Sequence, residues 1–235
     1  YNYIKAHGVD PATDRIEVAP GAHYLMGGIF IDEDCRASIE GLFAAPECAG
    51  NFDGANRMAA NGLTATQVFG ARAGRSAHKW AVAVGEWPEP EPVSLEIEIA
   101  RISSRITNAE FEGTSIIELR EKLRAAVQRY AGVTRDASGL ARLAALAKEI
   151  KKSLAYEKVP AISPFNQLLA DLLQLENMCE IAELVAGSAL LREESRGHHF
   201  RGDFPQQDDL NWLKHTMVRL RDNTPEFGTR EVIKI

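Results

Sequence analysis

Residues 23–57 contain two side chains that are suited to binding a carboxylate. Arg57 ends the tetrapeptide Gly-Ala-Asn-Arg, and a guanidinium group matches a carboxylate through two parallel hydrogen bonds, which a lysine cannot do. His23 begins the hexapeptide His-Tyr-Leu-Met-Gly-Gly, whose glycines let backbone approach a ligand closely. Its imidazole can donate to a carboxylate. On these residues alone two alternatives stay open: Arg57 could pair with a surface acid, and His23 could be a packing or surface residue.

Two further features nearby suit a ligand that carries hydroxyl groups and negative charge. Glu47 follows an apolar run that is predicted to be a strand, and a carboxylate at such a strand end can accept hydrogen bonds from sugar hydroxyls. Asn61, Gly62 and Leu63 open a predicted helix, whose free N–H groups and dipole favour negative charge. The alternative for Glu47 is an ordinary acid in a turn.

The segments around these residues are predicted to be short strands and one helix. Apolar runs at 28–31 and 41–45 predict two short strands in a layered sheet. In the helix that starts at Asn61, Gly70 and Gly74 lie on one face, which would allow close packing against a flat neighbour. The proline-rich segment 85–92 then favours an extended linker, because its prolines forbid a helix.

Beyond the linker the pattern is mainly helical. Apolar residues at 95, 99, 102 and 106 favour a helix, although residues 93–99 also alternate as in a strand. Ser115 and Glu118 fit a capping box at the start of the next helix, and Gly132 ends it. The remaining elements are predicted as helices over 137–155 and from Ser163-Pro164 to about 191, a loop over 195–206, a short helix over 208–217 and a strand over 229–235. The 164–191 helix is apolar on most sides, as the central member of a bundle would be.

Composition excludes several classes of protein. The net charge of −6 and the lack of a basic block argue against a nucleic-acid binder. No apolar run approaches the length that a membrane span needs, which is roughly 18 residues. The N-terminus does not resemble a signal peptide; it lacks a Met, as in a processed or excised fragment. No G-x-G-x-x-G occurs, so the sequence lacks the turn that would carry a dinucleotide pyrophosphate.

The cysteines and the C-terminal block bear on metal binding. Cys35, Cys48 and Cys179 give neither a disulfide framework nor a C-x-x-C motif, which favours a reducing, cytoplasmic location and excludes an iron–sulfur cluster held by this chain alone. The block 195–215 is rich in His, Asp and Arg, but its spacing fits no standard set of metal ligands. We therefore expect no metal site there. Arg196, Arg201 and the acids are expected to form an ion network that joins the bundle to the preceding domain.

Two motif blocks together resemble a known family. Residues 16–74, with the His23 and Arg57 motifs, and residues 194–215, Glu-Ser-Arg-Gly-His-His-Phe-Arg-Gly-Asp-Phe-Pro followed by Asp-Asp-Leu-Asn-Trp-Leu-Lys-His, are similar to the flavoprotein subunit of the succinate dehydrogenase/fumarate reductase family. That family includes L-aspartate oxidase and adenylylsulfate reductase. The resemblance covers essentially the whole chain, and the N-terminal part of the family, with its dinucleotide fingerprint, has no counterpart.

The resemblance implies roles for the residues identified above. His23 and Arg57 would bind a substrate carboxylate, and a hydride would pass between substrate and flavin N5. Glu47 would contact the ribityl or ribose part of FAD, and Asn61, Gly62 and Leu63 would face the flavin ring. The resemblance assigns no catalytic residue to this chain, because the family's proton-shuttling arginine belongs to the capping domain and has no counterpart here.

Three positions depart from the pattern of the family. Pro46 replaces a glycine before Glu47, Asp53 replaces a histidine before the Gly-Ala-Asn-Arg motif, and Gly62 replaces a serine. Asp53 would repel a dicarboxylate near Arg57 unless it is paired or protonated. These departures leave the substrate open among fumarate, succinate, aspartate and others.

The fold class that the resemblance implies is α/β plus all-α. The returning half of an FAD-binding Rossmann-like domain would be followed by a helical bundle and a short C-terminal extension. The expected boundaries are 1–17 for the end of a capping domain, 18–85 for the flavin domain, 86–92 for the linker, 93–192 for the bundle and 193–235 for the extension. A fragment with these parts is expected to be inactive alone.

The expected partners follow from the same resemblance. They are a small carboxylate substrate, the N-terminal half that carries the dinucleotide fingerprint, and an iron–sulfur or other electron-transfer subunit. A cytoplasmic protein that is peripheral at the inner membrane through such a subunit would fit. The alternative is a non-catalytic helical module that binds a partner subunit.

Overall fold

The computed structural model describes residues 1–17, 21–86, 89, 92–108, 116–162, 164–222 and 224–232. Its larger helices are α2 (Asn61–Val84), α3 (Pro92–Ser103), α4 (Ile116–Tyr130), α5 (Ala137–Leu154) and α6 (Gln167–Leu191), with the short α1 (Asn2–Ala6) and α7 (Asp209–Trp212) near the two ends. The strands form three two-stranded sheets, β1 (Ile29–Phe30) with β2 (Ala49–Gly50), β3 (Ile106–Thr107) with β4 (Val159–Pro160), and β5 (Lys214–Arg221) with β6 (Thr224–Glu231).

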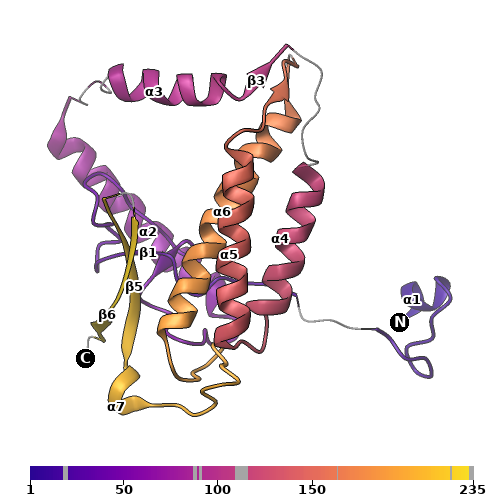
Figure 1. The fold of residues 1–235 in the computed structure, drawn as a ribbon. Coiled ribbons are helices and arrows are strands. Elements are labelled where there is room, and N and C mark those ends of the chain that lie inside the picture. The colour runs from indigo at the N-terminus through magenta and orange to yellow at the C-terminus, as the bar shows by residue number, and fades with distance from the viewer. Residues whose placement is uncertain are drawn as a thin grey trace.

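The helices α4, α5 and α6 form a bundle that holds the main hydrophobic core (Figure 1). Leu143 and Ile150 of α5 meet Leu172 and Leu175 of α6, and all four side chains are buried. The start of α5 is fixed by Asp136, whose carboxylate accepts a hydrogen bond from the Gly139 N–H at 2.8 Å. The predicted helices at 115–130 and 137–155 are therefore confirmed, and α6 is the central member of the bundle, although Ser115 of the predicted capping box lies outside the described residues.

The start of α6 differs from the prediction. The helix begins at Gln167, after an Asn166 cap that accepts from the Leu169 N–H at 3.1 Å, and not at Pro164. The reason is Phe165, whose φ of 64° is left-handed and incompatible with an α-helix. Ser163, the predicted cap, lies outside the described residues. The helix ends at Leu191, as predicted.

Residues 21–60 form an irregular layer with only two residues in each strand. Ile29 and Phe30 pair in parallel with Ala49 and Gly50, so the strand predicted at 28–31 is confirmed. The strand predicted at 41–45 is wrong: Phe43 makes one isolated bridge, to Arg36, because this stretch turns back on itself. A Cβ on Gly28 would lie 2.1 Å from the Cys48 carbonyl oxygen, so this close pairing requires glycine.

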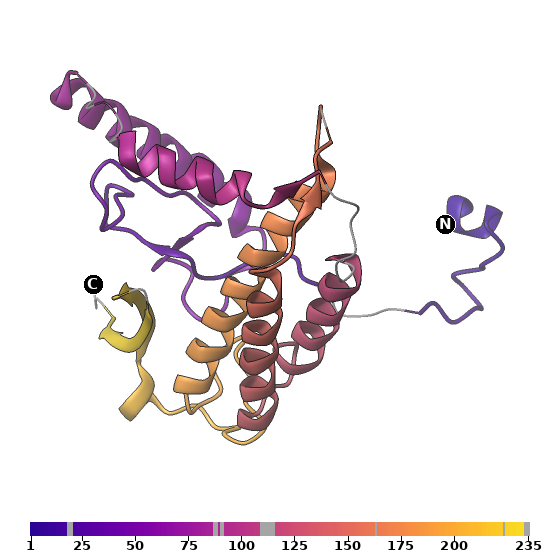
Figure 2. The same ribbon diagram turned by 45° about the horizontal axis from the view of Figure 1, so that its top comes forward.

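The helix α2 leaves this layer and leads to α3. Gly70 and Gly74 are exposed, and no described atom lies within 4 Å of a Cβ built on either. The close packing predicted for them is therefore not met by the described residues. The helix predicted after the linker is confirmed as α3, which crosses from the end of α2 to β3 at the far end of the bundle (Figure 2). It begins at Pro92, and most of the predicted linker, residues 87–88 and 90–91, lies outside the described residues.

The C-terminal elements were only partly predicted. The short helix starts after Asp208 as expected, but α7 ends at Trp212, and residues from Lys214 form β5 and not the rest of a helix. Thr216 and Val218 suit a strand, which pairs in antiparallel register with β6. The predicted strand at 229–235 is the end of β6 as far as Glu231, and residues 233–235 lie outside the described part.

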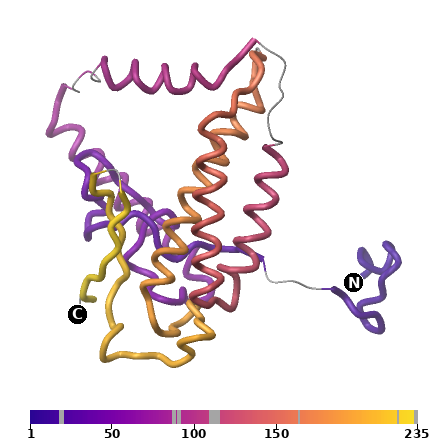
Figure 3. The backbone as a smooth tube through the Cα atoms, in the orientation of Figure 1, coloured from indigo at the N-terminus to yellow at the C-terminus, as the bar shows by residue number. Residues whose placement is uncertain are grey.

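The β5–β6 hairpin contacts both the bundle and the irregular layer, and Figure 3 shows it as the yellow tube beside the bundle. A Cβ on Gly187 of α6 would lie 2.3 Å from the ring of Phe227, so glycine is required where the hairpin packs on α6. On the other side, the Arg230 guanidinium lies 4.3 Å from the centre of the Phe30 ring. None of the described helices is both long and apolar enough to span a membrane.

Candidate functional site

Arg57 is placed between the His23 segment and the start of α2. Its guanidinium carbon lies 4.3 Å from the centre of the Tyr24 ring. Its backbone N–H donates to the Met26 sulfur at 2.8 Å, and its Nη1 makes one long hydrogen bond to the Met58 carbonyl, 3.4 Å. Its Nε is buried without a hydrogen-bond partner, and no described carboxylate forms an ion pair with it. The surface-acid alternative for Arg57 therefore has no partner within the described residues.

Tyr24 was missed as a functional residue by the sequence analysis. Its hydroxyl is buried without a hydrogen-bond partner. Burial raises the pKa of Tyr24, and so do the nearby carboxylates of Asp53 and Glu47, whereas Arg57 lowers it. The phenol therefore stays protonated, and it lies near both the Arg57 guanidinium and the Asp53 carboxylate, which is a nearby acceptor for its proton. A polar aromatic residue next to His23, in a segment flanked by glycines, was the signal that could have identified it.

The N-terminus of α2 borders the Arg57–Tyr24 pair. A Cβ on Gly62 would lie 3.1 Å from Arg57 Nη1 and 3.7 Å from Tyr24 Cε2. The residue before the helix, Ala60, has a φ of 66° and offers no side-chain cap. Asn61 donates its N–H to the Met58 carbonyl at 3.1 Å, but no described acceptor takes the N–H groups of Gly62 or Leu63. Two of the three predicted N–H donors are therefore available to an anionic ligand.

Glu47 and His23 lie at the edge of this group. One Glu47 oxygen accepts a hydrogen bond from the Leu25 N–H at 3.0 Å. This bond joins the segment that contains His23 to the residues just before β2. No described donor reaches the second oxygen, which can therefore accept from a ligand. His23 is exposed and makes no hydrogen bond or ion pair with a described residue. The structure thus brings Glu47, Arg57 and Gly62 together around Tyr24, with His23 beside them in the chain.

The C-terminal block folds around a fully buried carboxylate, Glu194. It pairs with Arg192 and with Arg196, at 2.8 and 3.0 Å, and accepts from the Asp208 N–H at 2.8 Å. Burial acts to raise the pKa of Glu194, but the hydrogen bonds from Arg196 and Asp208 outweigh it and lower the pKa overall. Glu194 is therefore a charged structural anchor.

Arg201 is the second buried charge of the block. Its Nη1 donates to the carbonyls of Ala189, Leu190 and Arg192 at 2.7, 3.2 and 3.0 Å, and its other nitrogens bind Asp203 at 2.8 Å. A cation here satisfies the last carbonyls of α6 and complements its dipole. The ion network predicted for Arg196 and Arg201 is present, but its ion pairs lie within the block. The link to the Arg57 loop is instead a backbone hydrogen bond, from the His198 N–H to the Ala55 carbonyl at 3.0 Å.

His199 should make the stability of this block depend on pH. Burial, with help from the charges of Arg135, Arg192 and Arg201, lowers the pKa of His199 to about 4. In the unfolded chain the pKa of His199 is near 6.5, so between pH 7 and 5 this histidine binds a proton in the unfolded state but not in the folded state. Stability should fall as the pH falls from 7 to 5, by about 2 kcal/mol from this residue. Urea unfolding at both pH values should show a smaller fall for His199→Gln.

The matched control for this prediction is Gln67→Asn, which changes an exposed residue of α2 that has no titrating side chain. It should leave the dependence of the unfolding free energy on pH unchanged. Parallel curves for the natural chain and His199→Gln would contradict the assignment, because the buried imidazole would then contribute nothing to proton linkage.

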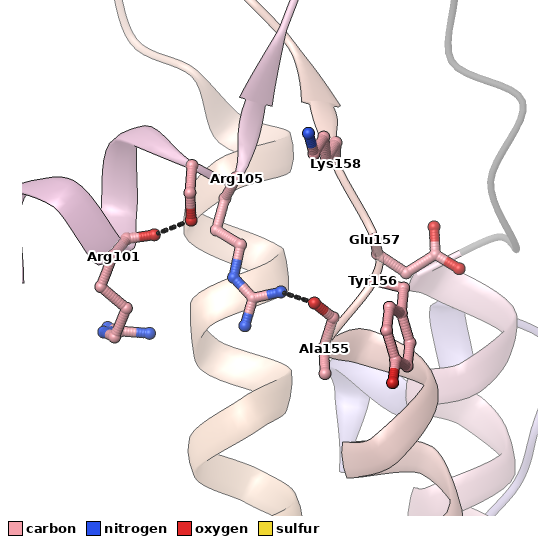
Figure 4. Close-up of a pocket in the computed structure, with 7 residues that line it drawn as sticks. Arg101, Arg105, Ala155, Tyr156, Glu157 and Lys158 are labelled. Atoms are coloured by element: carbon pink, nitrogen blue, oxygen red, sulfur yellow. Dashed lines mark hydrogen bonds between the residues drawn. The ribbon is translucent and has the colours of Figure 1, made fainter.

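A pocket at the far end of the bundle is occupied by the chain's own interactions. Figure 4 shows Arg105 directed at the end of α5, where its Nη1 donates to the carbonyls of Leu154 and Ala155 at 2.8 and 2.7 Å. Its Nη2 pairs with Glu176. Arg101 at the rim is held by Glu98 and Glu176. These arginines stabilise the bundle, and they are already neutralised, unlike Arg57.

Comparison with known proteins gives a consistent set of relatives. A family profile described as fumarate reductase flavoprotein C-term matches residues 120–234, and a profile described as FAD binding domain matches residues 1–63. The flavoprotein subunit of fumarate reductase from Mycobacterium tuberculosis is 35% identical over 234 residues, which cover 94% of this chain and 39% of that protein. L-aspartate oxidase of Caulobacter vibrioides is 40% identical over 219 residues, 93% of this chain and 35% of that protein.

Solved structures have the same fold. Mycobacterium smegmatis Sdh1 in complex with UQ1 matches 99% of this chain with a TM-score of 0.89 and 30% identity, and a quinol-fumarate reductase with menaquinol molecules matches 100% with a TM-score of 0.87 and 32% identity. Adenylylsulfate reductase of Archaeoglobus fulgidus, 17% identical with a TM-score of 0.69, shares the fold. The chain spans about 39% of the length of the first of these curated relatives.

Proposed function

The chain belongs to the succinate dehydrogenase/fumarate reductase flavoprotein family. We propose that it is the C-terminal part of an FAD-dependent oxidoreductase that acts on a carboxylate-bearing substrate. The proposed division is 1–17 for the end of a capping domain, 18–85 for the returning half of the FAD-binding domain, 86–92 for the linker, 93–192 for the helical bundle and 193–235 for the extension. FAD, the cofactor named by the matching profile, is also the cofactor proposed here.

The observation that carries this proposal is the state of Arg57. It is a half-buried cation, stacked on Tyr24, with its Nε buried and unpartnered and with no carboxylate of the described chain paired to it. Taking a charge out of water without a partner is costly. A bound substrate carboxylate would supply the missing partner of Arg57, and it would compete with Asp53 for the hydroxyl of Tyr24.

The residues present also fit a flavin beside that carboxylate. The N–H groups of Gly62 and Leu63 have no described acceptor, and the helix behind them favours negative charge. When bound, FAD supplies the group that accepts or donates the hydride. Arg57 and His23 would hold the substrate carboxylate, Gly62 and Leu63 would donate to the flavin ring, Asn61 would support that turn, and Glu47 would accept from the ribityl or ribose hydroxyls.

Asp53 bears on the choice of substrate. It lies half-buried in the same loop as Arg57, and it acts on Tyr24 to raise the pKa of the phenol. Its negative charge disfavours a second carboxylate nearby unless a hydrogen bond from Tyr24 offsets it. The proposal is therefore a substrate held by one carboxylate at Arg57, without a choice between fumarate, succinate and aspartate.

The proposed partners complete the protein. A half with the dinucleotide-binding motif would supply the pyrophosphate contacts, and an iron–sulfur or other electron-transfer subunit would exchange electrons with the flavin, at a membrane if that subunit is bound there. Two of the relatives are named as subunits of a fumarate reductase. The names of the relatives are those of oxidoreductases, which favours the enzyme over a non-catalytic interaction module.

Cofactor retention tests the proposal. The intact flavoprotein, meaning this chain together with the half that carries the dinucleotide-binding motif, should be yellow and should show a flavin absorption band after gel filtration. The isolated 235-residue chain should lose added FAD, because the pyrophosphate contacts are absent. A colourless intact protein would contradict the enzyme, and stoichiometric flavin in the isolated chain would contradict the division of the cofactor site.

A further inference from the structure

The loop that carries Arg57 has few contacts of its own. Asn51, Gly54 and Ala60 have φ values of 84°, 66° and 66°, so the loop between β2 and α2 has no regular structure to fix it. Among the described residues, one backbone–backbone hydrogen bond reaches residues 52–57, and it is the bond from the His198 N–H to the Ala55 carbonyl, 3.0 Å. Phe52 anchors the start of the loop against Phe69, and the backbone position of Ala55 depends on a segment that lies far along the chain, beyond the bundle.

Gly197 makes that contact possible. Its φ is +57°, and a Cβ on it would lie 2.2 Å from the Ala55 carbonyl oxygen and 2.6 Å from the carbonyl carbon. The obstacle is backbone, which cannot move aside as the end of a flexible side chain can. Any side chain at position 197 would therefore push the Arg57 loop away from the C-terminal block.

The opposite side of the His198 peptide is fixed by the bundle. Arg135, in the connection between α4 and α5, donates from Nη1 to the His198 carbonyl at 3.1 Å and lies 3.4 Å from His199 Nδ1. Its own backbone N–H donates to the Phe200 carbonyl at 3.1 Å. A continuous set of contacts thus runs from the bundle through Arg135 and His198 to Ala55.

We propose that Gly197, His198 and Arg135 are positioning residues for Arg57, so that the helical bundle sets the geometry of the carboxylate site. This inference rests on the function proposed above. Ala55 is two residues before Arg57, and the other backbone anchor of Arg57 is the Met26 sulfur. A guanidinium fork binds a carboxylate well only when it is held in place. Loss of the Ala55 contact should weaken carboxylate binding without removing any group that touches the ligand.

The test uses the intact flavoprotein and malonate, a dicarboxylate that cannot accept a hydride, with binding followed by the change in flavin absorption. Gly197→Ala should raise the Kd of malonate about tenfold, a loss of about 1.4 kcal/mol. Gly202→Ala is the matched control in the same loop, because a Cβ there makes only ordinary contacts, at 3.6 Å and beyond. In steady state with fumarate, KM should rise while kcat stays close to that of the control. Flavin content should match that of the control.

A double-mutant cycle separates positioning from general damage. In an Arg57→Gln background, Gly197→Ala should add little to the Kd of malonate, because the residue that it positions is already gone. An equal added loss in that background would overturn the proposal, and so would a Gly197→Ala protein with unchanged malonate binding. If Arg57→Gln alone leaves malonate binding unchanged, the proposed function fails and not merely the positioning.

Arg135→Gln provides a second route if Gly197→Ala does not fold. It leaves Gly197 and Ala55 untouched and removes the donors to the His198 and Ala131 carbonyls together with the contact to His199 Nδ1. Like Gly197→Ala, it should raise the KM for fumarate. Arg135→Lys should raise KM less, since a lysine can still donate to the His198 carbonyl. Unchanged KM in Arg135→Gln would contradict the proposed route through the bundle.

Discussion

Replacing Arg57 with glutamine should lower kcat/KM for the carboxylate substrate by about a thousandfold, because truncating one partner of a desolvated charge pair costs several kcal/mol. Flavin should remain bound, since Arg57 is proposed to touch the substrate and not the cofactor. Arg57→Lys should be intermediate, because the ammonium keeps the charge but loses the two-pronged geometry. The measurement is steady-state turnover per bound flavin, with fumarate as acceptor and a reduced dye as donor.

The control for this prediction is Arg36→Gln, in the same layer of the protein. Arg36 is exposed and pairs with Asp34, so its loss should leave turnover unchanged. A protein with Arg57→Gln that lost flavin but kept normal turnover per remaining flavin would contradict the substrate role and would assign Arg57 to the cofactor.

Replacing Arg201 with methionine should destabilise the chain by about 3–5 kcal/mol, the cost of removing one partner from a buried ion pair. Arg201 is 1% exposed, and its loss would leave Asp203 unpaired and the last carbonyls of α6 without donors. Methionine keeps much of the length of the side chain, so the effect would report the charge and hydrogen bonds more than a cavity. Urea unfolding of the 235-residue chain measures it.

Arg219→Met is the matched comparison, because Arg219 also pairs with a carboxylate, that of Glu226 at 2.6 Å, but on the surface of the hairpin. Exposed ion pairs contribute little, so this variant should unfold close to the natural chain. Equal losses for the two variants would show that burial at the end of α6 does not determine the contribution of Arg201.

The helices could be predicted from the sequence because their apolar spacing is long and regular. The apolar stripe of α5 consists of Leu140, Leu143, Leu146, Ile150 and Leu154, and it predicts this helix; four of the five are buried in the structure and Leu146 is partly buried. Helix boundaries that depend on the backbone conformation of one residue were harder to predict. The left-handed conformation of Phe165 prevents α6 from starting before Gln167. The hairpin was partly misassigned because the polar, alternating pattern at 214–221 also fits the end of a helix.

The candidate site was predictable in its residue types but not in its connections. Arg57 and the start of α2 are adjacent in sequence, and the structure places Gly62 against the guanidinium. The contact between Ala55 and His198 joins backbone groups far apart in the chain, and no side-chain pattern marks such a bond. The role of Tyr24 also depended on burial of its hydroxyl, which the sequence does not show.

The most direct test of the central claim is electron exchange between the flavin and a carboxylate substrate. The flavin of the intact protein would be reduced without oxygen and mixed rapidly with fumarate, with succinate and L-aspartate tested against the oxidised flavin. We predict that at least one of the three changes the flavin band in the natural protein and that the same compound fails with Arg57→Gln, while a dye reacts with both. A flavin that exchanges electrons with the dye and with none of the three carboxylates would contradict the proposed function.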